Sequence, residues 1–342
     1  MRHRPLGRSG VTVTELSHGT AALGGLYAPV GEEEARAAVD AAWEEGVRCF
    51  DTAPHYGLGL SERRLGAALA DRPREEYVLS TKVGRLLVPA PGAVGDDLAH
   101  GFAVPATHRR VWDFGADGVR RGLEESLGRL GLDRIDVVLL HDPDDHERQA
   151  LEEAYPALER MRAEGTVGAI GVGMNQSAMP ARFVRDTDID VVLCAGRYTL
   201  LDTGALSDLL PAASARSVSV MVGGVYNSGL LADPRPGASF DYAPAPPAVL
   251  ERALRLKAVA GRHGVPLRAA ALRFPLAHPA VAAVLTGGRS AAEVRDAAAM
   301  LRRPVPAAFW EELRAAGLLP PDAPVPEPAG GPAVAGEEEA DR

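Results

Sequence analysis

Short β-rich runs alternate with segments of helical periodicity along most of the chain. Most of these runs are continuously apolar, which is typical of parallel strands covered on both faces. The candidate strands are residues 16–19, 48–50, 77–81, 135–140, 169–172, 190–194, 218–222 and 281–285. Eight strand–helix units in succession favour an α/β fold of the closed (β/α)8 TIM-barrel type over an open doubly wound sheet. The open sheet would also require a G-x-G-x-x-G turn after its first strand, and the sequence has none.

Two segments interrupt this alternation. Residues 88–112 form a long connection after the third predicted strand; it exceeds an ordinary βα loop, and we expect it to be functional. Residues 320–342 are rich in Pro, Gly, Ala and Glu, a composition typical of a disordered tail. The sequence therefore predicts a single barrel domain over residues 1–319, followed by a tail over residues 320–342.

The charge balance excludes one broad class of partner. The chain of 342 residues has 46 acidic and 37 basic side chains and a net charge of −9, whereas nucleic-acid binding requires a basic stripe. No apolar stretch approaches the roughly 20 residues of a membrane span, and residues 1–10 lack the apolar segment of a secretory signal. Cys49 and Cys194 lie in apolar runs and cannot build a disulfide framework. We expect a cytoplasmic monomer or homodimer that acts on a small molecule and binds neither nucleic acid nor membrane.

Lysine is almost absent from the chain. Of the 37 basic residues only Lys82 and Lys257 are lysines. A lysine that persists where arginine is so strongly preferred indicates a need for a compact ammonium whose pKa can be shifted. Lys257 falls on a predicted helix surface, where chance survival explains it. Lys82 follows a predicted strand and is the stronger candidate for chemistry.

Polar residues gather where three neighbouring predicted strands end. Asp51 and Tyr56 follow the second strand, Lys82 follows the third, and His141 follows the fourth. Singly, each has a structural explanation, as a turn cap, a packed loop aromatic, a chance survivor or a core histidine. Because the carboxyl ends of barrel strands meet at one rim, where barrel enzymes carry their chemistry, the four together predict a catalytic site.

These four groups suit a proton exchange. A phenol with an ordinary pKa near ~10 is a poor acid or base at neutral pH. A neighbouring ammonium stabilises the phenolate and lowers that pKa, and a carboxylate keeps the ammonium charged and in place. An imidazole can orient the substrate oxygen or relay its proton. The predicted reaction is the interconversion of an alcohol and a carbonyl, in which the carbon gains or loses a hydride.

With these residues, the sequence resembles the aldo-keto reductases. The similarity runs from about residue 5 to about residue 318, and its most specific parts are DTAPHYGLGLSERRLG (51–66) and the STKVGR stretch that contains Lys82. The family consists of (β/α)8 barrels with an Asp/Tyr/Lys/His tetrad, which Asp51, Tyr56, Lys82 and His141 match. HDPDDH (141–146) and GVGMNQ (171–176) are similar to the sugar-oxidising branch of D-threo-aldose 1-dehydrogenases and L-fucose dehydrogenases.

The resemblance implies a function. Tyr56 would act as general base on the anomeric hydroxyl of a cyclic aldose of the L-fucose, D-arabinose or L-galactose type, C1 would deliver hydride to a nicotinamide, and an aldonolactone would result. His55, Tyr56, His141, Trp112 and Tyr27 are the expected substrate-binding residues, with His108 as a further candidate from the long loop.

The resemblance also implies cofactor contacts. The expected cofactor-binding residues are Gly19, Thr20, Asp51, Asn175, Asn227, Ser228, Gly229, Leu230, Gly288, Arg289, Ser290 and Glu293. Backbone N–H groups of the 227–230 loop and the helix start after residue 288 suit phosphate oxygens. Glu293 stands where NADP-preferring relatives often have arginine; a carboxylate there repels a 2′-phosphate and favours NAD over NADP, although Arg289 could still bind that phosphate.

Besides Glu293, three positions depart from the family pattern. Gly223 stands where many relatives have a tyrosine that stacks on the nicotinamide, and Ala195 stands where many have a glutamine for its carboxamide. Ala297 replaces an asparagine of the final helix, which weakens the expected adenine contacts. These differences leave the placement of the nicotinamide open.

Several other functions fit part of the pattern. One is a general aldehyde or ketone reductase of the same family. A metal-dependent hydrolase or lyase would use the ligand-rich run 141–146, although the other strand ends offer no second histidine cluster and we expect no metal. A Schiff-base aldolase would need a neutral Lys82 amine, which Asp51 opposes. A non-catalytic nucleotide-sensing subunit is the last alternative, and an intact tetrad argues against it.

Overall fold

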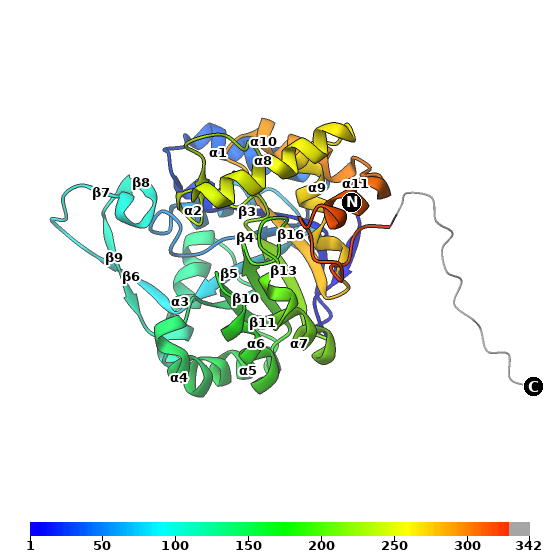
Figure 1. Ribbon diagram of the computed structural model, residues 1–342. Coiled ribbons are helices and arrows are strands. Elements are labelled where there is room, and N and C mark those ends of the chain that lie inside the picture. Colours follow the sequence, from blue (N-terminus) through cyan, green and yellow to red (C-terminus); the bar gives the residue numbers. More distant parts are fainter. Residues whose placement is uncertain (328–342) are drawn as a thin grey trace, which may run out of the picture.

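Eight parallel strands close into a barrel in the computed structural model, which describes residues 1–327 (Figure 1). The strands neighbour one another in the order of the sequence, and the last pairs with the first. They are β3 (Leu16–Gly19), β4 (Cys49–Asp51), β5 (Val78–Val83), β10 (Ile135–His141), β11 (Val167–Met174), β12 (Val191–Ala195), β13 (Ser219–Gly223) and β16 (Val281–Gly287). The predicted (β/α)8 barrel is confirmed.

Helices cover the outside of the barrel (Figure 1). The main ones are α1 (Glu32–Glu44), α2 (Leu60–Leu69), α3 (Ala116–Leu130), α5 (Tyr155–Ala163), α6 (Ala178–Asp186), α7 (Leu209–Arg216), α8 (Pro247–Arg262), α9 (Leu267–Arg273), α10 (Ala291–Arg302) and α11 (Ala307–Ala315). Shorter helical turns are η1 (Ala21–Gly24), η2 (Arg74–Glu76), η3 (Leu98–His100), η4 (Asp144–His146), α4 (Glu147–Gln149), η5 (Ala150–Ala154), η6 (Gly204–Leu206) and η7 (Pro275–Ala277). Within residues 1–327, no helix has both the length and the apolar character needed to cross a membrane.

The barrel interior is apolar at one end and polar at the other. Side chains of a strand alternate between its two faces, so on β10 the interior set that contains Val137 and Leu139 continues to His141 at the strand end. On β5 the same alternation takes Val78 through Ser80 to Lys82. The apolar members pack together in one interior cluster. The polar members therefore lie above that cluster, at the carboxyl end of the strands.

An N-terminal hairpin closes the opposite end of the barrel. Strands β1 (His3–Pro5) and β2 (Thr12–Thr14) pair antiparallel. Leu6 and Val13 are fully buried and belong to the interior cluster. The hairpin thus excludes water from the N-terminal end, which leaves the carboxyl end as the open side.

The long connection after β5 is a structured insert rather than an irregular loop. It contains β6 (Arg85–Pro89), which pairs antiparallel with β9 (His108–Trp112), and the shorter β7 (Asp96–Asp97), which pairs with β8 (Phe102–Pro105). The insert projects from one side of the barrel (Figure 1). The sequence predicted its position and length but not its two strand pairs.

Two further segments complete the described chain. After β13, residues 224–246 make a second excursion that contains β14 (Ser239–Phe240) and β15 (Ala243–Pro244). Residues 320–327, predicted to begin the disordered tail, pack against the barrel: Ala323 is fully buried, and its carbonyl accepts a hydrogen bond from Arg314. The packed chain therefore extends past the boundary expected at residue 320, and the rest of that prediction lies outside the described residues.

Candidate active site

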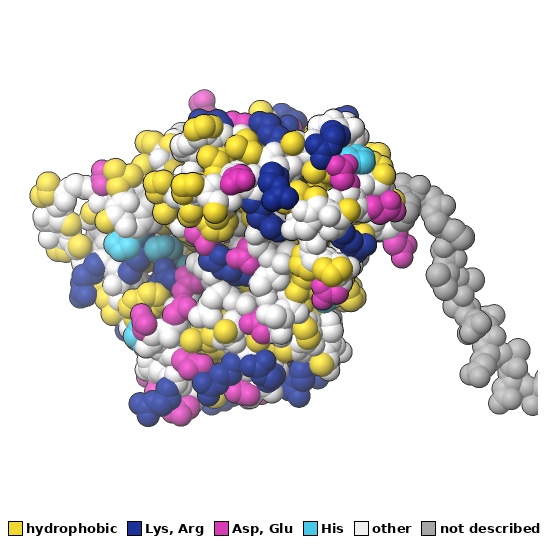
Figure 2. Space-filling view, viewed as in Figure 1, with side chains coloured by type: hydrophobic (Ala, Val, Ile, Leu, Met, Phe, Trp, Pro, Cys, Tyr) yellow, Lys and Arg dark blue, Asp and Glu magenta, His cyan; other side chains and the backbone are white. Residues whose placement is uncertain are grey.

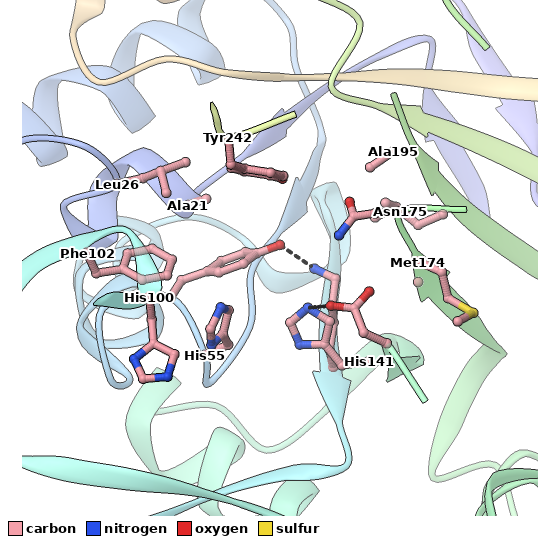
Figure 3. Close-up of a pocket in the computed structure, with 15 residues that line it drawn as sticks. Ala21, Leu26, His55, His100, Phe102, His141, Met174, Asn175, Ala195 and Tyr242 are labelled. Atoms are coloured by element: carbon pink, nitrogen blue, oxygen red, sulfur yellow. Dashed lines mark hydrogen bonds and ion pairs between the residues drawn. The ribbon is translucent and has the colours of Figure 1, made fainter. Parts of the chain in front are cut away.

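Two connected cavities open at the carboxyl end of the barrel. The smaller has a volume of about 270 Å³ and the larger a volume of about 700 Å³. Tyr56, Asn175 and Tyr242 line both. We call the smaller one the substrate cavity and the larger one the cofactor groove, after the uses proposed below. Figure 3 shows the substrate cavity, with Leu26 and Phe102 on one side and Asn175 and Met174 on the other.

A chain of hydrogen bonds joins three of the four predicted catalytic side chains. Lys82 Nζ donates to Asp51 Oδ2 at 2.7 Å and to Tyr56 Oη at 3.1 Å. It donates a third hydrogen bond to the carbonyl of Thr52 at 2.9 Å, so all three ammonium protons have acceptors. The fourth residue, His141, faces the same space, with its ring centroid 6.0 Å from that of Tyr56. The structure therefore brings all four together.

Backbone geometry fixes where Tyr56 stands. The residue after it, Gly57, has a φ of +59°, and a Cβ at that position would lie 2.2 Å from the carbonyl oxygen of Gly24. Only glycine permits both this left-handed conformation and this close approach. The loop after β4 can therefore lie against the β3–α1 connection, which directs Tyr56 into the cavity above Lys82.

Burial opposes the charges of this cluster. Burial by itself lowers the pKa of Lys82, but the Asp51 carboxylate and the Tyr56 oxygen outweigh it and raise the Lys82 pKa above its ordinary value. Burial also raises the pKa of Tyr56, and the Lys82 ammonium offsets only part of that rise. The expectation that Lys82 would bring the Tyr56 pKa below its ordinary value is therefore not met. Tyr56 is a phenol at neutral pH, beside a lysine that stays charged.

His141 is a neutral imidazole. Burial, together with the nearby Arg85 and Lys82 cations, holds its pKa well below the ordinary value. Its Nε2 lies 3.6 Å from Asp142 Oδ2 (Figure 3), and within the described part of the chain its buried Nδ1 has no hydrogen-bond partner. Asp142 also forms an ion pair with Arg85 at the start of the insert. A neutral His141 has one N–H, which can be given to a substrate oxygen.

The insert supplies one wall of the substrate cavity. Its His100 and Phe102 line the cavity beside His55, which comes from the loop after β4. The rings of His55 and Phe102 meet edge to face with centroids 5.2 Å apart. In the space-filling view, histidine and arginine side chains gather where the insert meets the barrel (Figure 2). The predicted functional role of this connection thus has a structural basis, since the cavity is incomplete without it.

Three residues expected to bind substrate lie outside the substrate cavity. Trp112 is not among the residues that line either cavity; its ring stacks on Phe114 and lies under the Arg85 guanidinium. His108 is likewise absent from both linings and contacts Thr107. Tyr27 lines the cofactor groove, close to Tyr242. Of the expected substrate contacts, His55, Tyr56 and His141 line the substrate cavity.

The cofactor groove contains most of the expected cofactor residues. Those that line it are Gly19, Asp51, Asn175, Asn227, Ser228, Gly229, Gly288, Arg289 and Glu293. The other three are structural: Thr20 hydroxyl donates to the carbonyl of Asp51, Leu230 is fully buried, and the Ser290 hydroxyl accepts from the Glu293 N–H at the start of α10. Gly223, Ala195 and Ala297, the three departures from the family pattern, all line the groove as well.

The groove fits a dinucleotide. It is long enough to reach from the start of α10 to Tyr56, and its volume exceeds twice that of the substrate cavity. Asn227 Oδ1 is buried on its wall and, within residues 1–327, accepts no hydrogen bond. This oxygen is therefore available to accept a hydrogen bond from a ligand bound in the groove. Small residues along the floor leave room for flat rings.

Two ion pairs flank the far end of the groove. Arg289 Nε lies 3.7 Å from Glu293 Oε1, and Arg268 Nε lies 3.0 Å from Asp296 Oδ2. Each arginine therefore already has a carboxylate partner, so that end of the groove holds no excess of positive charge. An additional phosphate would have to compete with these carboxylates.

Four polar or aromatic residues of the substrate cavity were not identified from the sequence. His100 and Phe102 belong to the insert, Tyr242 to the excursion after β13, and Asp142 follows His141 directly. Of these four, only Asp142 could have been recognised from the sequence, because it lies at a strand end within the acidic run 141–146. Tyr242 has a φ of +64° and is held by a hydrogen bond from its N–H to Ser228 Oγ. Neither feature is visible in the sequence.

The comparisons with known proteins agree with this geometry. The model of the Aldo/keto reductase family matches residues 15–317. The chain is 44% identical to a D-threo-aldose 1-dehydrogenase from Pseudomonas sp., over 91% of this chain and 96% of that protein. It is 41% identical to a pyridoxal 4-dehydrogenase from Microbacterium luteolum, over 92% and 97%. Its structure matches the holo form of an aldo-keto reductase from Bacillus halodurans with a TM-score of 0.75, at 26% identity, over 96% and 98% of the two chains.

Proposed function

Because the chain belongs to the aldo/keto reductase family and is an oxidoreductase, we propose that it oxidises the anomeric hydroxyl of a cyclic aldose. The reaction turns the C1–OH group of the hemiacetal into the carbonyl of an aldonolactone. The observation that carries the proposal is the hydrogen-bonded chain from Asp51 through Lys82 to Tyr56, which ends where the two cavities meet.

Each side chain has a separate task in this reaction. Tyr56 Oη takes the proton of the anomeric hydroxyl, and Lys82 stabilises the charge on that oxygen while the proton is transferred. Asp51 keeps the ammonium of Lys82 in place. The neutral His141 donates an N–H to the substrate oxygen and so fixes its direction. A nicotinamide bound in the groove supplies the acceptor for the hydride that leaves C1.

The two relatives described above are named for compounds that both form cyclic hemiacetals. Aldoses close on themselves into cyclic hemiacetals, and pyridoxal does so through its neighbouring hydroxymethyl group. One of the relatives is named for an aldose and the other for pyridoxal. The similarity to both supports a cyclic hemiacetal as the substrate class, with an aldose of the L-fucose, D-arabinose or L-galactose type as the specific proposal.

We propose NAD as the preferred cofactor. The carboxylates of Glu293 and Asp296 hold the two arginines at the far end of the groove. A 2′-phosphate would meet both carboxylates, whereas a free 2′-hydroxyl would not be repelled.

One observation favours a second function, the reduction of a simple aldehyde or ketone. Burial raises the pKa of Tyr56, and a protonated phenol is the form that donates a proton to a carbonyl oxygen. The metal-dependent alternative has less support, because among residues 1–327 no group of three or more His, Cys, Asp or Glu side chains is placed to hold a metal ion. Lys82, kept charged by Asp51, is unsuited to form a Schiff base.

Initial rates separate these functions. We would measure oxidation of L-fucose, D-arabinose, L-galactose and pyridoxal, and reduction of a set of aromatic aldehydes, each with both cofactors. The proposal expects the largest kcat/KM for one of the aldoses with NAD. A larger kcat/KM for pyridoxal or for an aldehyde would show that the aldose is not the preferred substrate.

A further inference from the structure

His55 is held by an arginine from the insert. Arg110, on β9, donates from Nε to His55 Nδ1 at 2.5 Å and from a terminal nitrogen to the carbonyl oxygen of His55 at 2.9 Å. Asp97 in turn accepts two hydrogen bonds from Arg110, at 2.7 and 2.5 Å. The side chains of Arg110 and Asp97 are only 8% and 5% exposed. Arg110 and Asp97 therefore form a buried ion pair that holds His55, and we call this pair the clamp.

This contact determines the tautomer of His55. A guanidinium has donors only and stays protonated, so the nitrogen that faces it must be an unprotonated acceptor. The single proton of the ring is then on Nε2. A second proton on Nδ1 would oppose the N–H of Arg110, and Asp97 prevents the guanidinium from turning away. Burial and the cations Arg85 and Arg110 accordingly lower the pKa of His55 to about 2.

The surroundings of His55 leave its Nε2–H available to the cavity. The ring lies between those of His100 and His141 (Figure 3), with centroids 6.4 and 5.6 Å away. The Tyr56 ring centroid is 6.1 Å away. Phe102 contacts it edge to face. The charged groups around it are Arg85, Arg110, Lys82, Asp97 and Asp142. An imidazolium would therefore face three cations, and its nearest anions are already committed to arginines.

We propose that Arg110, clamped by Asp97, fixes His55 as a permanently neutral imidazole whose Nε2–H donates to a second oxygen of the substrate. This second oxygen is not the one that contacts Tyr56. In a cyclic hemiacetal it is the ring oxygen or a neighbouring hydroxyl. The assignment rests on the proposed function, and it makes Arg110 and Asp97 positioning residues that select oxygen-rich substrates over simple aldehydes.

The tautomer can be observed without any substrate. Nitrogen-15 NMR of the histidine-labelled enzyme, with the His55 signals assigned by their loss in His55→Gln, distinguishes the two ring nitrogens. We expect Nδ1 unprotonated and Nε2 protonated at every pH from 5 to 8. A protonated Nδ1, or a titration of His55 within that range, would overturn the clamp whatever reaction the enzyme catalyses.

Kinetics test the consequence for specificity. In Arg110→Met the donor to Nδ1 is lost, so we expect KM for the best aldose to rise about tenfold with a much smaller change in kcat. Loss of the Arg110 charge should also raise the pKa of His55, so a new ionisation should appear on the acid side of the kcat/KM profile, still below the ordinary histidine value because burial and Arg85 remain. Arg109→Met is the matched control, since Arg109 is the preceding residue on β9 and is exposed; it should behave as the unmodified enzyme.

Companion variants keep the test decisive if Arg110→Met folds poorly. His55→Gln retains an N–H donor, so its KM for the aldose should stay close to that of the unmodified enzyme, whereas His55→Phe should raise it. Asp97→Asn keeps Arg110 but weakens its hold, so it should raise the aldose KM by less than Arg110→Met does and should add no ionisation to the pH profile. Equal KM values for the Gln and Phe variants, or a pH profile of Arg110→Met that matches Arg109→Met, would refute the positioning role. Failure of the proposed function would look different: no hemiacetal would be turned over, yet the NMR result would stand.

Discussion

The substrate cavity and the cofactor groove meet at Tyr56 but are built by different means. The substrate cavity contains charged and imidazole side chains, and two of them have specific partners: Lys82 contacts Asp51 and His55 contacts Arg110. The groove is lined by many glycines and alanines, and the arginines among its lining residues, Arg268 and Arg289, lie at its far end beside carboxylate partners. A single substitution should therefore have a large effect on chemistry in the cavity and a small, graded effect on affinity in the groove.

Tyr56→Phe is the strongest test of this contrast. Loss of the hydroxyl removes the proton acceptor but leaves the shape of both cavities, so we expect kcat to fall by 10³-fold or more, a loss within the range of general acid–base catalysis and charge stabilisation combined. The dissociation constant for NAD, measured by fluorescence titration, should change less than threefold. A variant that kept a tenth of the activity would remove Tyr56 from the reaction, and a large loss of NAD affinity would erase the distinction between the two regions.

Lys82→Met comes next in size. Without the ammonium the phenolate is no longer stabilised, so we expect a loss of about 10²-fold in kcat. The Asp51 carboxylate would also be left buried without its partner, which costs about 3 kcal/mol or more of folding free energy. The double variant Asp51→Asn/Lys82→Met is the control. Compared with Lys82→Met, it should regain most of the lost free energy of unfolding, measured in urea, but none of the lost kcat. Recovered activity in the double variant would mean that Lys82 acts only through stability.

The pH dependence tests the same charges in the unmodified enzyme. Burial raises the pKa of Tyr56 above its ordinary value, so at neutral pH only a small fraction of the enzyme has the phenolate required for oxidation. Log kcat/KM for the aldose should then rise by about one unit per pH unit between pH 7 and pH 10, and carbonyl reduction should fall once the phenol ionises. Lys82, whose pKa is raised, stays charged over this range. A profile that is flat from pH 7 to pH 10, and equally flat in Lys82→Met, would assign the base to another group.

The same contrast explains how much the sequence could predict. The barrel followed from apolar runs at strand spacing, and the four catalytic candidates followed from residue types that change where strands end. Lys82 was conspicuous because lysine is so rare in this chain. In the substrate cavity the chemistry depends on side-chain identity, which a sequence states directly.

What the sequence could not predict depends on contacts between distant loops. Arg110 contacts His55 across 55 residues of chain. The strands β6 and β9, whose pairing brings it there, are separated in the sequence by the β7–β8 pair. Trp112 was expected in the cavity because an aromatic face suits a sugar, but the same hairpin places it on Phe114 instead. The Tyr56 pKa was misjudged for a related reason, since the depth of burial is a property of the fold.

Glu293→Gln, in the cofactor groove, should have the smallest and most selective effect of these substitutions. The side chain is half exposed and lies 3.7 Å from Arg289, so removing its charge frees the arginine to meet a 2′-phosphate. Because interactions of exposed ion pairs amount to about 1 kcal/mol or less, we expect the ratio of kcat/KM for NADP to that for NAD to rise only about threefold to fivefold. The control is Glu311→Gln on α11, a residue outside the lining of both cavities, which should leave the ratio unchanged. An unchanged ratio in Glu293→Gln as well would show that backbone shape, and not the charge at the start of α10, determines which dinucleotide the groove accepts.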